Sequence, residues 1–109
     1  MTEETHYQVL KILEQNPRVS QRELATELGV SLGKANYCLK ALVEKGWVKM
    51  HNFSENPHKL HYAYLLTPRG LKAKTTLTTN FLKSKLAEYE VLKTEIEQLQ
   101  NETGSLTGD

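Results

Sequence analysis

The chain has 109 residues, of which 39% are apolar and 25% are charged, with a formal net charge of +1 and one cysteine. This length and composition indicate one soluble domain with an appendage, and the lack of long apolar runs excludes a transmembrane helix and a secretory signal. We therefore expect a cytoplasmic protein, in which Cys38 forms no intrachain disulfide.

The charge is distributed unevenly along the chain. Residues 1–87 carry 13 Lys and Arg against 7 acidic residues, a balance of +6. Residues 88–109 carry one Lys against 6 acidic residues, a balance of −5. A basic body with an acidic end indicates two segments with different partners, and the body is the segment suited to a polyanion.

The first part of the sequence predicts two short helices. An apolar stripe indicates a helix over residues 2–15, which stops before Pro17 because the residue preceding a proline disfavours the helical region. Ser20 and Glu23 then form a capping box that starts a second helix. That helix ends at Gly29, which suits the left-handed position after a helix.

A third helix is predicted to begin at the cap Ser31 and to end at Gly46. Its helical wheel separates an apolar face, expected to pack inward, from a polar face. The inward face consists of Leu32, Ala35, Leu39 and Leu42. The outward face consists of Gly33, Lys34, Asn36, Tyr37, Lys40 and Glu44.

The hydrophobic period changes after the third helix. Two strand-length segments, WVKMHNF and LHYAYLL, flank the turn-forming SENPHK and predict a β-hairpin with its tip near Pro57. Thr67 and Pro68 then provide the N-cap and first position of a helix that meets no strong stop before Gly104. At about 34 residues this helix would be about 50 Å long, and the poor helix-forming stretch TTLTTN is expected to kink or break it.

The second half of the long helix carries an apolar heptad pattern with one interruption at Lys85. We expect residues 71–100 to pair two subunits in a homodimeric coiled coil, whose orientation the short seam leaves open. The alternative is that this segment folds back as a core helix. The residues predicted to mediate dimerisation are Leu71, Leu82, Leu86, Tyr89, Leu92, Ile96 and Leu99.

Together these elements predict a mainly α fold with a small β-hairpin, namely a winged helix-turn-helix with a long C-terminal coiled-coil helix. We expect a DNA-binding domain over residues 1–67, a dimerisation helix over residues 68–102 and a flexible tail over residues 103–109.

The polar face of the third helix is suited to double-stranded DNA, because the major groove admits a helix with a polar, positively biased surface. Lysines would neutralise phosphates, Asn36 could bond adenine, and Gly33 would allow close approach of the backbone. The second helix would cross the DNA backbone, and the hairpin tip would reach the minor groove. The predicted DNA contacts are Gln21, Arg22, Ser31, Gly33, Lys34, Asn36, Tyr37, Lys40, His58 and Lys59. A dimer predicts a palindromic operator.

The segment GVSLGKANYCLKALVEKGWV resembles the GVS-x-x-T-V-x-R-x-L-x-x-L-x-x-x-G-[LW]-[VI] pattern of bacterial winged-helix regulators. The segment YAYLLTPRGLKAK resembles the strand-to-helix junction of the MarR family, so that the likeness covers residues 6–74. The short chain, the HYAYLLTPRG junction and the single long C-terminal helix are similar to the small MarR-type regulators associated with exopolysaccharide gene clusters. This resemblance implies transcriptional control of surface polysaccharide genes.

The chain departs from the MarR pattern in two ways. MarR wings usually carry an Asp-x-Arg element whose arginine enters the minor groove, whereas this wing reads SENPHKLHY and offers only Lys59 and histidines. Typical members also build their dimer from both termini and bind small phenolic ligands near that junction. This chain has almost nothing before its first helix, so we expect no such pocket and assign no inducer.

The sequence also bears on four other functions. A winged helix that docks proteins without binding DNA is the alternative, and it would need an exposed apolar patch, which the wheel lacks. Cys38 lies beside the buried stripe, as a packing residue rather than a redox sensor. His51, His58 and His61 lack further ligands for a metal site. No enzyme motif or cofactor motif is present.

Overall fold

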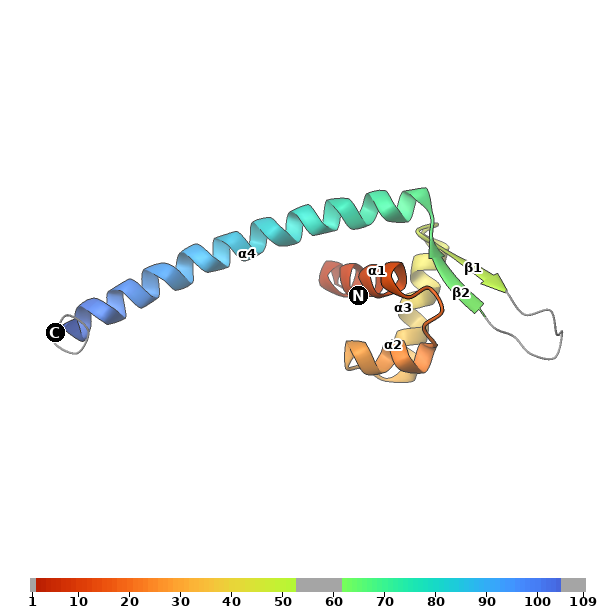
Figure 1. Ribbon diagram of the computed structural model, residues 1–109, viewed down its shortest axis with the longest axis horizontal. Helices are drawn as coiled ribbons and strands as arrows, with labels where there is room; N and C mark the ends of the chain where they lie inside the picture. The colour runs from red at the N-terminus through yellow and green to blue at the C-terminus, as the bar shows by residue number, and fades with distance from the viewer. Residues whose placement is uncertain (1, 53–61, 105–109) are drawn as a thin grey trace. The chain divides into compact units, whose positions relative to one another are not determined.

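The computed structural model of the chain describes residues 2–52 and 62–104 (Figure 1). In chain order the elements are α1 (Glu3–Gln15), α2 (Gln21–Leu28), α3 (Leu32–Glu44), β1 (Val48–Asn52), β2 (Tyr62–Leu66) and α4 (Pro68–Glu102). The predicted fold class is therefore confirmed: the chain is mainly helical, with a hairpin wing and a long C-terminal helix. The predicted hairpin tip and the tail beyond residue 104 lie outside the described residues.

The chain divides into two compact units, residues 1–78 and residues 79–109. The first unit contains the short helices, the hairpin and the first turns of α4, and the second contains the rest of α4. Within the described residues, no helix combines the length and the apolar character that crossing a membrane requires.

The helix ends follow the capping chemistry of the sequence. Ser20 Oγ accepts a hydrogen bond from the backbone nitrogen of Glu23 at 3.0 Å, and Glu23 Oε1 accepts one from the backbone nitrogen of Ser20 at 3.4 Å. This reciprocal pair is the predicted capping box at the start of α2. Gly29 follows α2 with φ of +69°, the left-handed conformation that glycine adopts without steric cost.

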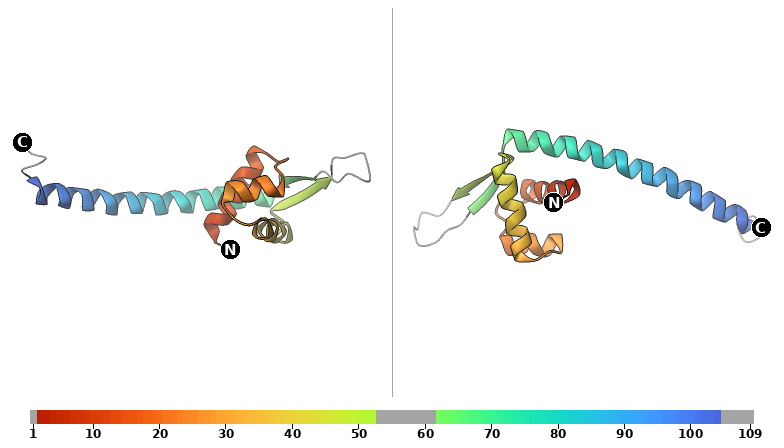
Figure 2. Two further views of the ribbon diagram at one scale, coloured as in Figure 1. Left: turned by 90° about the horizontal axis from the view of Figure 1, so that it is seen from below. Right: turned by 180° about the vertical axis from the view of Figure 1, so that it is seen from behind.

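Helices α1, α2 and α3 lie close together in the views of Figure 2, and the core of the first unit is formed between them, with residues of the hairpin and α4 added. Its buried residues are Val9, Leu10, Leu13, Val19, Leu24, Ala25, Ala35, Cys38, Leu39, Leu42, Val48, Tyr64 and Leu77. Cys38 is completely buried, in agreement with a packing role. The prediction for Leu32 is wrong, since it is 44% exposed. Its wheel angle points inward, but the first residue of α3 lies beyond the end of the packed layer.

The hairpin is held against the helices by a backbone hydrogen bond. β1 and β2 are antiparallel, with Met50 opposite Tyr64 and Asn52 opposite Tyr62. The backbone nitrogen of Tyr64 donates to the carbonyl of Pro17 at 2.9 Å, in the segment between α1 and α2. Strand β2 is thereby tied to the segment that joins α1 and α2.

The backbone of Trp47 joins α3, the hairpin and α4. Its nitrogen donates to the carbonyl of Leu42 at 3.1 Å, and its carbonyl accepts from the nitrogen of Thr67 at 3.0 Å. The hydroxyl of Thr67 donates to the carbonyl of Gly46 at 2.5 Å and accepts from the nitrogen of Gly70 at 3.1 Å, as the predicted N-cap of α4. Gly70 lies directly against the carbonyl of Trp47, so an added methyl group would overlap that oxygen.

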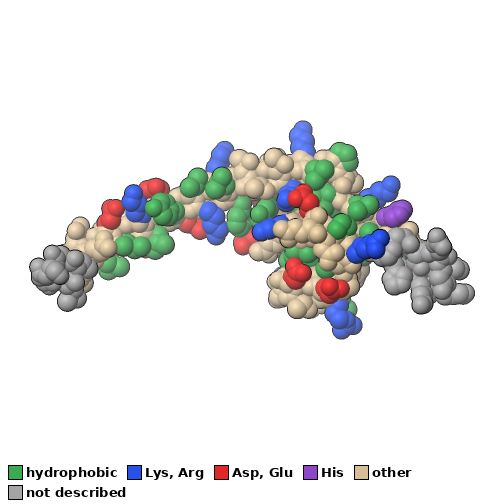
Figure 3. Space-filling view, in the orientation of Figure 1, with side chains coloured by type: hydrophobic (Ala, Val, Ile, Leu, Met, Phe, Trp, Pro, Cys, Tyr) green, Lys and Arg blue, Asp and Glu red, His purple; other side chains and the backbone are tan. Residues whose placement is uncertain are grey.

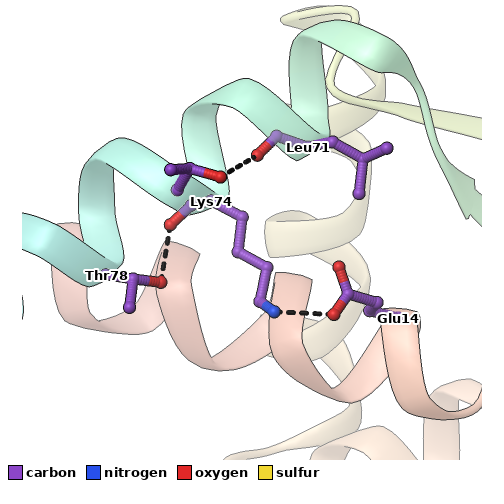
Figure 4. Close-up of polar contacts among 5 residues, drawn as sticks. Glu14, Leu71, Lys74 and Thr78 are labelled. Atoms are coloured by element: carbon purple, nitrogen blue, oxygen red, sulfur yellow. Dashed lines mark hydrogen bonds and ion pairs between the residues drawn. The ribbon is translucent and has the colours of Figure 1, made fainter.

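The long helix does not break at residues 75–80, because α4 is helical from Pro68 to Glu102. The hydroxyls of Thr75 and Thr78 donate to the carbonyls of Leu71 and Lys74 at 3.0 and 2.7 Å. These bonds satisfy the threonine hydroxyls within the helix itself. Lys74 also forms an ion pair with Glu14 of α1 at 2.7 Å, shown in Figure 4.

His6 of α1 packs edge-on against Trp47, with 5.7 Å between the ring centroids. Its Nε2 atom is buried and finds no hydrogen-bond partner among the described residues. Burial, and next the ammonium group of Lys45, lower the pKa of His6 below its usual value of 6.5. Burial would strip water from a protonated imidazole, and Lys45 would repel its positive charge. Both effects favour the neutral form of His6 and so lower its pKa.

We predict opposite effects for two helical Gly→Ala substitutions. Gly70→Ala should lower the free energy of unfolding by about 1–3 kcal/mol or more, because the new methyl group displaces the carbonyl of Trp47. The new methyl group of Gly33→Ala has no atom within 4 Å, so this substitution should raise the free energy of unfolding by about 0.5–1 kcal/mol. Urea denaturation of both variants measures the difference, and equal stabilities would show that the joint at Trp47 tolerates a side chain.

We also predict that acid destabilises the fold through His6. The unfolded state takes up a proton near pH 6.5, whereas the folded state resists it to a lower pH. The neutral His6 therefore contributes its full share of folding stability above pH 6.5. This share is lost as the pH falls through the lowered pKa of His6. His6→Gln should flatten this part of the curve of unfolding free energy against pH. Parallel curves for the variant and the wild type between pH 7.5 and about 5 would contradict the assignment.

Candidate nucleic-acid interface

The outward face of α3 is held by a local cap and is open to solvent. The hydroxyl of Ser31 accepts a hydrogen bond from the backbone nitrogen of Lys34 at 3.1 Å and so starts the helix. Tyr37 is 67% exposed, although it is aromatic. The residues predicted for this face are all exposed, and they are Gly33, Lys34, Asn36, Tyr37, Lys40 and Glu44. Their contact with DNA stays a prediction.

The positive charge of this face is available to a partner. Neither Lys34 nor Lys40 forms an ion pair with any residue in the described ranges. Arg22, at the start of α2, is also exposed. Cations without an intramolecular partner are the groups that can neutralise phosphates.

Gln21 is placed differently from the other predicted contacts. It is half-buried, and its Nε2 atom donates a hydrogen bond to the hydroxyl of Tyr64 at 3.1 Å. This bond links the start of α2 to strand β2. The side chain therefore has a partner within the protein, and no pattern in the sequence indicated this bond. His58 and Lys59, predicted at the wing tip, lie outside the described residues.

A groove of about 280 Å³ lies between α3 and the hairpin. One wall of the groove is formed by α3, with polar residues of the predicted interface and with apolar residues. The hairpin forms the opposite wall. The lining residues are Gln21, Asn36, Leu39, Lys40, Val43, Met50, Tyr62 and Tyr64. Met50 and Tyr62 were not predicted to line a groove, although the alternation of side chains along each strand could have placed them on one face.

Single large apolar side chains of α3 and the wing are exposed, although the helical wheel predicted no apolar patch there. Leu32, Met50 and Leu65 are 44%, 45% and 40% exposed, and Tyr37 is more exposed still. Met50 and Leu65 lie on opposite faces of the hairpin, because they pair with Tyr64 and Lys49 at adjacent register positions. These side chains therefore do not form one continuous patch on the hairpin.

Metal binding finds no support in the part of the chain that the structure describes. No group of three or more His, Cys, Asp and Glu is placed there to hold an ion. Cys38 is a buried free thiol. Of the three hairpin histidines considered above, only His51 lies within the described residues.

The second unit presents an apolar stripe along α4, visible as green side chains on the helix in Figure 3. Its large apolar residues are between 46% and 60% exposed, and they are Leu82, Leu86, Tyr89, Leu92, Ile96 and Leu99. Val91 is also 60% exposed, but its position along the helix places it on the opposite face. Leu71, which was predicted to mediate dimerisation, lies in the first unit and is 47% exposed. Exposed apolar side chains at heptad spacing are the usual mark of a helix that pairs with another.

Comparison with known proteins agrees with this geometry. Residues 2–49 match the family model described as winged helix-turn-helix DNA-binding. A curated relative, the HTH-type transcriptional regulator Ptr1 of Methanocaldococcus jannaschii, is 34% identical over 104 residues. The match covers 95% of this chain and 66% of that protein, so the chain spans just under two thirds of the relative's length.

Solved structures share the fold at low sequence identity. A MarR/EmrR family transcriptional regulator from Acinetobacter sp. ADP1 is 20% identical, with a TM-score of 0.63 over 93% of this chain and 75% of that chain. The MepR–DNA complex of S. aureus is 18% identical, with a TM-score of 0.66 over 99% and 77%. The curated relative and the Acinetobacter protein are both described as transcriptional regulators, which agrees with the prediction that the chain is not an enzyme.

Proposed function

We propose that the chain is a sequence-specific transcriptional regulator that binds a palindromic operator as a homodimer, because residues 2–49 match the winged helix-turn-helix DNA-binding model and the chain has the fold of MarR-type regulators. The observation that carries this proposal is the face of α3. Lys34, Asn36, Tyr37 and Lys40 are exposed together on a capped helix whose other face is buried in the core.

The residues of α3 divide by chemistry into two roles. Lys34 and Lys40 are flexible point charges, and they set affinity by neutralising phosphates whatever the sequence. The amide of Asn36 offers a donor and an acceptor, the pair that a bidentate bond to adenine needs. Tyr37 presents an aromatic ring that can contact a base edge or a methyl group. Affinity and sequence preference are therefore separable by mutation.

The apolar stripe of α4 supports dimerisation. Such side chains lose water when two helices pair. Each Å² of apolar surface that is buried stabilises the pair by about 25 cal/mol, and this gain drives the association. The heptad spacing from Leu82 to Leu99 places most of them on one seam. A dimer would present two copies of α3, spaced about one turn of DNA apart on a palindromic site.

The finer proposal is that the regulated genes direct exopolysaccharide synthesis. It is supported by the resemblance of the junction HYAYLLTPRG to that of small regulators found in such gene clusters. No residue chemistry adds to it. The competing function is a docking module for proteins, and the exposed Met50, Leu65 and Leu32 are the observation in its favour.

Fluorescence anisotropy with the chain's own upstream region and a scrambled duplex, across a salt series, tests the proposed function. Tight and salt-dependent binding that prefers the upstream DNA supports a sequence-specific regulator. Equal, weak binding to both duplexes means that the operator is elsewhere. No binding even at low salt contradicts DNA binding and favours the docking module.

Lys40→Ala and Asn36→Ala are predicted to affect binding in different ways. Lys40→Ala should weaken binding to all duplexes and reduce the slope of log affinity against log salt by about one unit. Asn36→Ala should relax the preference at one base pair, at a cost of about 1–3 kcal/mol for the preferred duplex only. Anisotropy with single-base operator variants measures both effects. Wild-type binding by both variants would refute the role of α3.

Leu92→Lys is predicted to dissociate the dimer, since it places a charge in the apolar seam of α4. Thr94→Lys is the matched control, because residue 94 is two positions further along the helix and points away from that seam. Sedimentation velocity should give a monomer for the first variant and a dimer for the second. Dimers of equal stability in both variants would show that the seam lies elsewhere.

A further inference from the structure

His6 carries a polar atom that the fold leaves unsatisfied. Among the described residues, its Nε2 is the one buried side-chain nitrogen or oxygen atom without a hydrogen-bond partner. The imidazole ring packs edge-on against Trp47, with 5.7 Å between the ring centroids. A neutral imidazole needs a proton on only one of its two nitrogens, whereas a charged imidazole must donate from both. The site therefore accepts the neutral ring and leaves a protonated Nε2 without an acceptor.

The charges near His6 also oppose a proton on it. Lys45, at the end of α3, holds its ammonium group 5.1 Å from the centroid of the Trp47 ring. Lys45 and the terminal amino group disfavour a charge on His6, and Glu3 in the exposed first turn of α1 favours one. From α4, the guanidinium of Arg69 lies beside the glycine turn before Trp47 and adds a further cation to this region. Positive charges therefore outnumber the single carboxylate.

Trp47 connects the surroundings of His6 to the elements of the DNA-binding unit. Its indole is half-buried and packs against the core. The backbone of the same residue donates to the carbonyl of Leu42 in α3 and accepts from the nitrogen of Thr67 after β2. Its carbonyl also lies directly against Gly70 of α4. A movement of the indole therefore acts on the joint that holds α3 beside the hairpin.

A protonated His6 has a route to water. The residue lies near the start of α1 and is half-buried, so its ring can turn outward without breaking the helix. Side-chain rotation of this kind is fast compared with unfolding. Once the ring has turned, the indole of Trp47 loses its edge contact and has space to move.

Resting on the proposed function, we propose that the contact between His6 and Trp47 is a proton-operated switch that weakens DNA binding in acid. The neutral imidazole holds Trp47, and Trp47 holds α3 and the hairpin in the arrangement that binds DNA. The protonated imidazole leaves Trp47 and loosens that arrangement.

The direction of the pH effect follows from linkage. The DNA-binding arrangement contains the neutral His6, so affinity is complete above pH 6.5 and falls as the pH drops below that value. An exposed histidine such as His51 has the opposite effect, because its protonation adds positive charge and strengthens binding to a polyanion. A loss of affinity in acid therefore distinguishes the switch from ordinary surface histidines.

The first test uses Trp47 itself as the reporter, because it is the only tryptophan of the chain. Trp47 emission of the wild type should change between pH 7.5 and about 5, with its midpoint below pH 6.5. His6→Phe keeps an aromatic ring but takes up no proton, so its emission should stay constant. Circular dichroism of both proteins over the same range checks that they remain folded. Constant emission in the wild type overturns the proposal.

The second test measures anisotropy with the wild type's best duplex at both ends of this pH range. Wild-type affinity should fall about fivefold or more in acid, the lower end of typical coupling between two sites. His6→Phe should keep its affinity. His6→Gln lacks the ring contact, so it should bind more weakly at every pH but show no acid loss. His51→Gln, the matched control at an exposed histidine, should lose affinity as the wild type does.

The outcomes separate this inference from the proposed function. If the wild type binds DNA but its affinity holds or rises in acid, the switch is overturned and the proposed function stands. The switch is also overturned if both His6 variants lose affinity in acid as the wild type does. If the wild type binds no duplex at either pH, both fail together. Acid loss in the wild type and His51→Gln, without acid loss in the His6 variants, supports the switch.

Discussion

The attachment of three elements to the backbone of one residue, Trp47, is the constraint on which the first unit depends. Its nitrogen closes the end of α3, and its carbonyl accepts from Thr67 where the hairpin leads into α4. Gly46 turns the chain into this position with φ of +76°, and Gly70 lets α4 pass directly against the carbonyl. The angle between α3 and the hairpin follows from these contacts, and so does the groove between them.

The two faces of α3 show how stability and binding are divided on one helix. Ala35, Cys38, Leu39 and Leu42 are buried and fix the helix to the core. The residues of the opposite face are exposed and contribute little to stability, so binding a partner can determine their identity without destabilising the fold. Because its lysines form no ion pair with described residues, their charge acts outward rather than within the fold.

Most of the predicted site follows from periodicity, and its departures have identifiable causes. The wheel placed Asn36, Tyr37 and Lys40 on the exposed face, because the angle around a helix depends only on spacing. It misplaced Leu32, because an angle does not say how far the packed layer extends along the axis. It could not reveal the bond between Gln21 and Tyr64, which are 43 positions apart in the chain.

The sequence by itself determined the order of the elements and where the helices begin. Local chemistry at Ser20, Ser31 and Thr67 starts the helices that the structure contains, since a cap needs only the residues of the first turn. Only the tertiary structure decided that residues 75–80 continue a helix, that Trp47 joins the elements and that Met50 faces α3. These features depend on contacts between distant segments, whose free energy outweighs the small local propensities that a sequence displays.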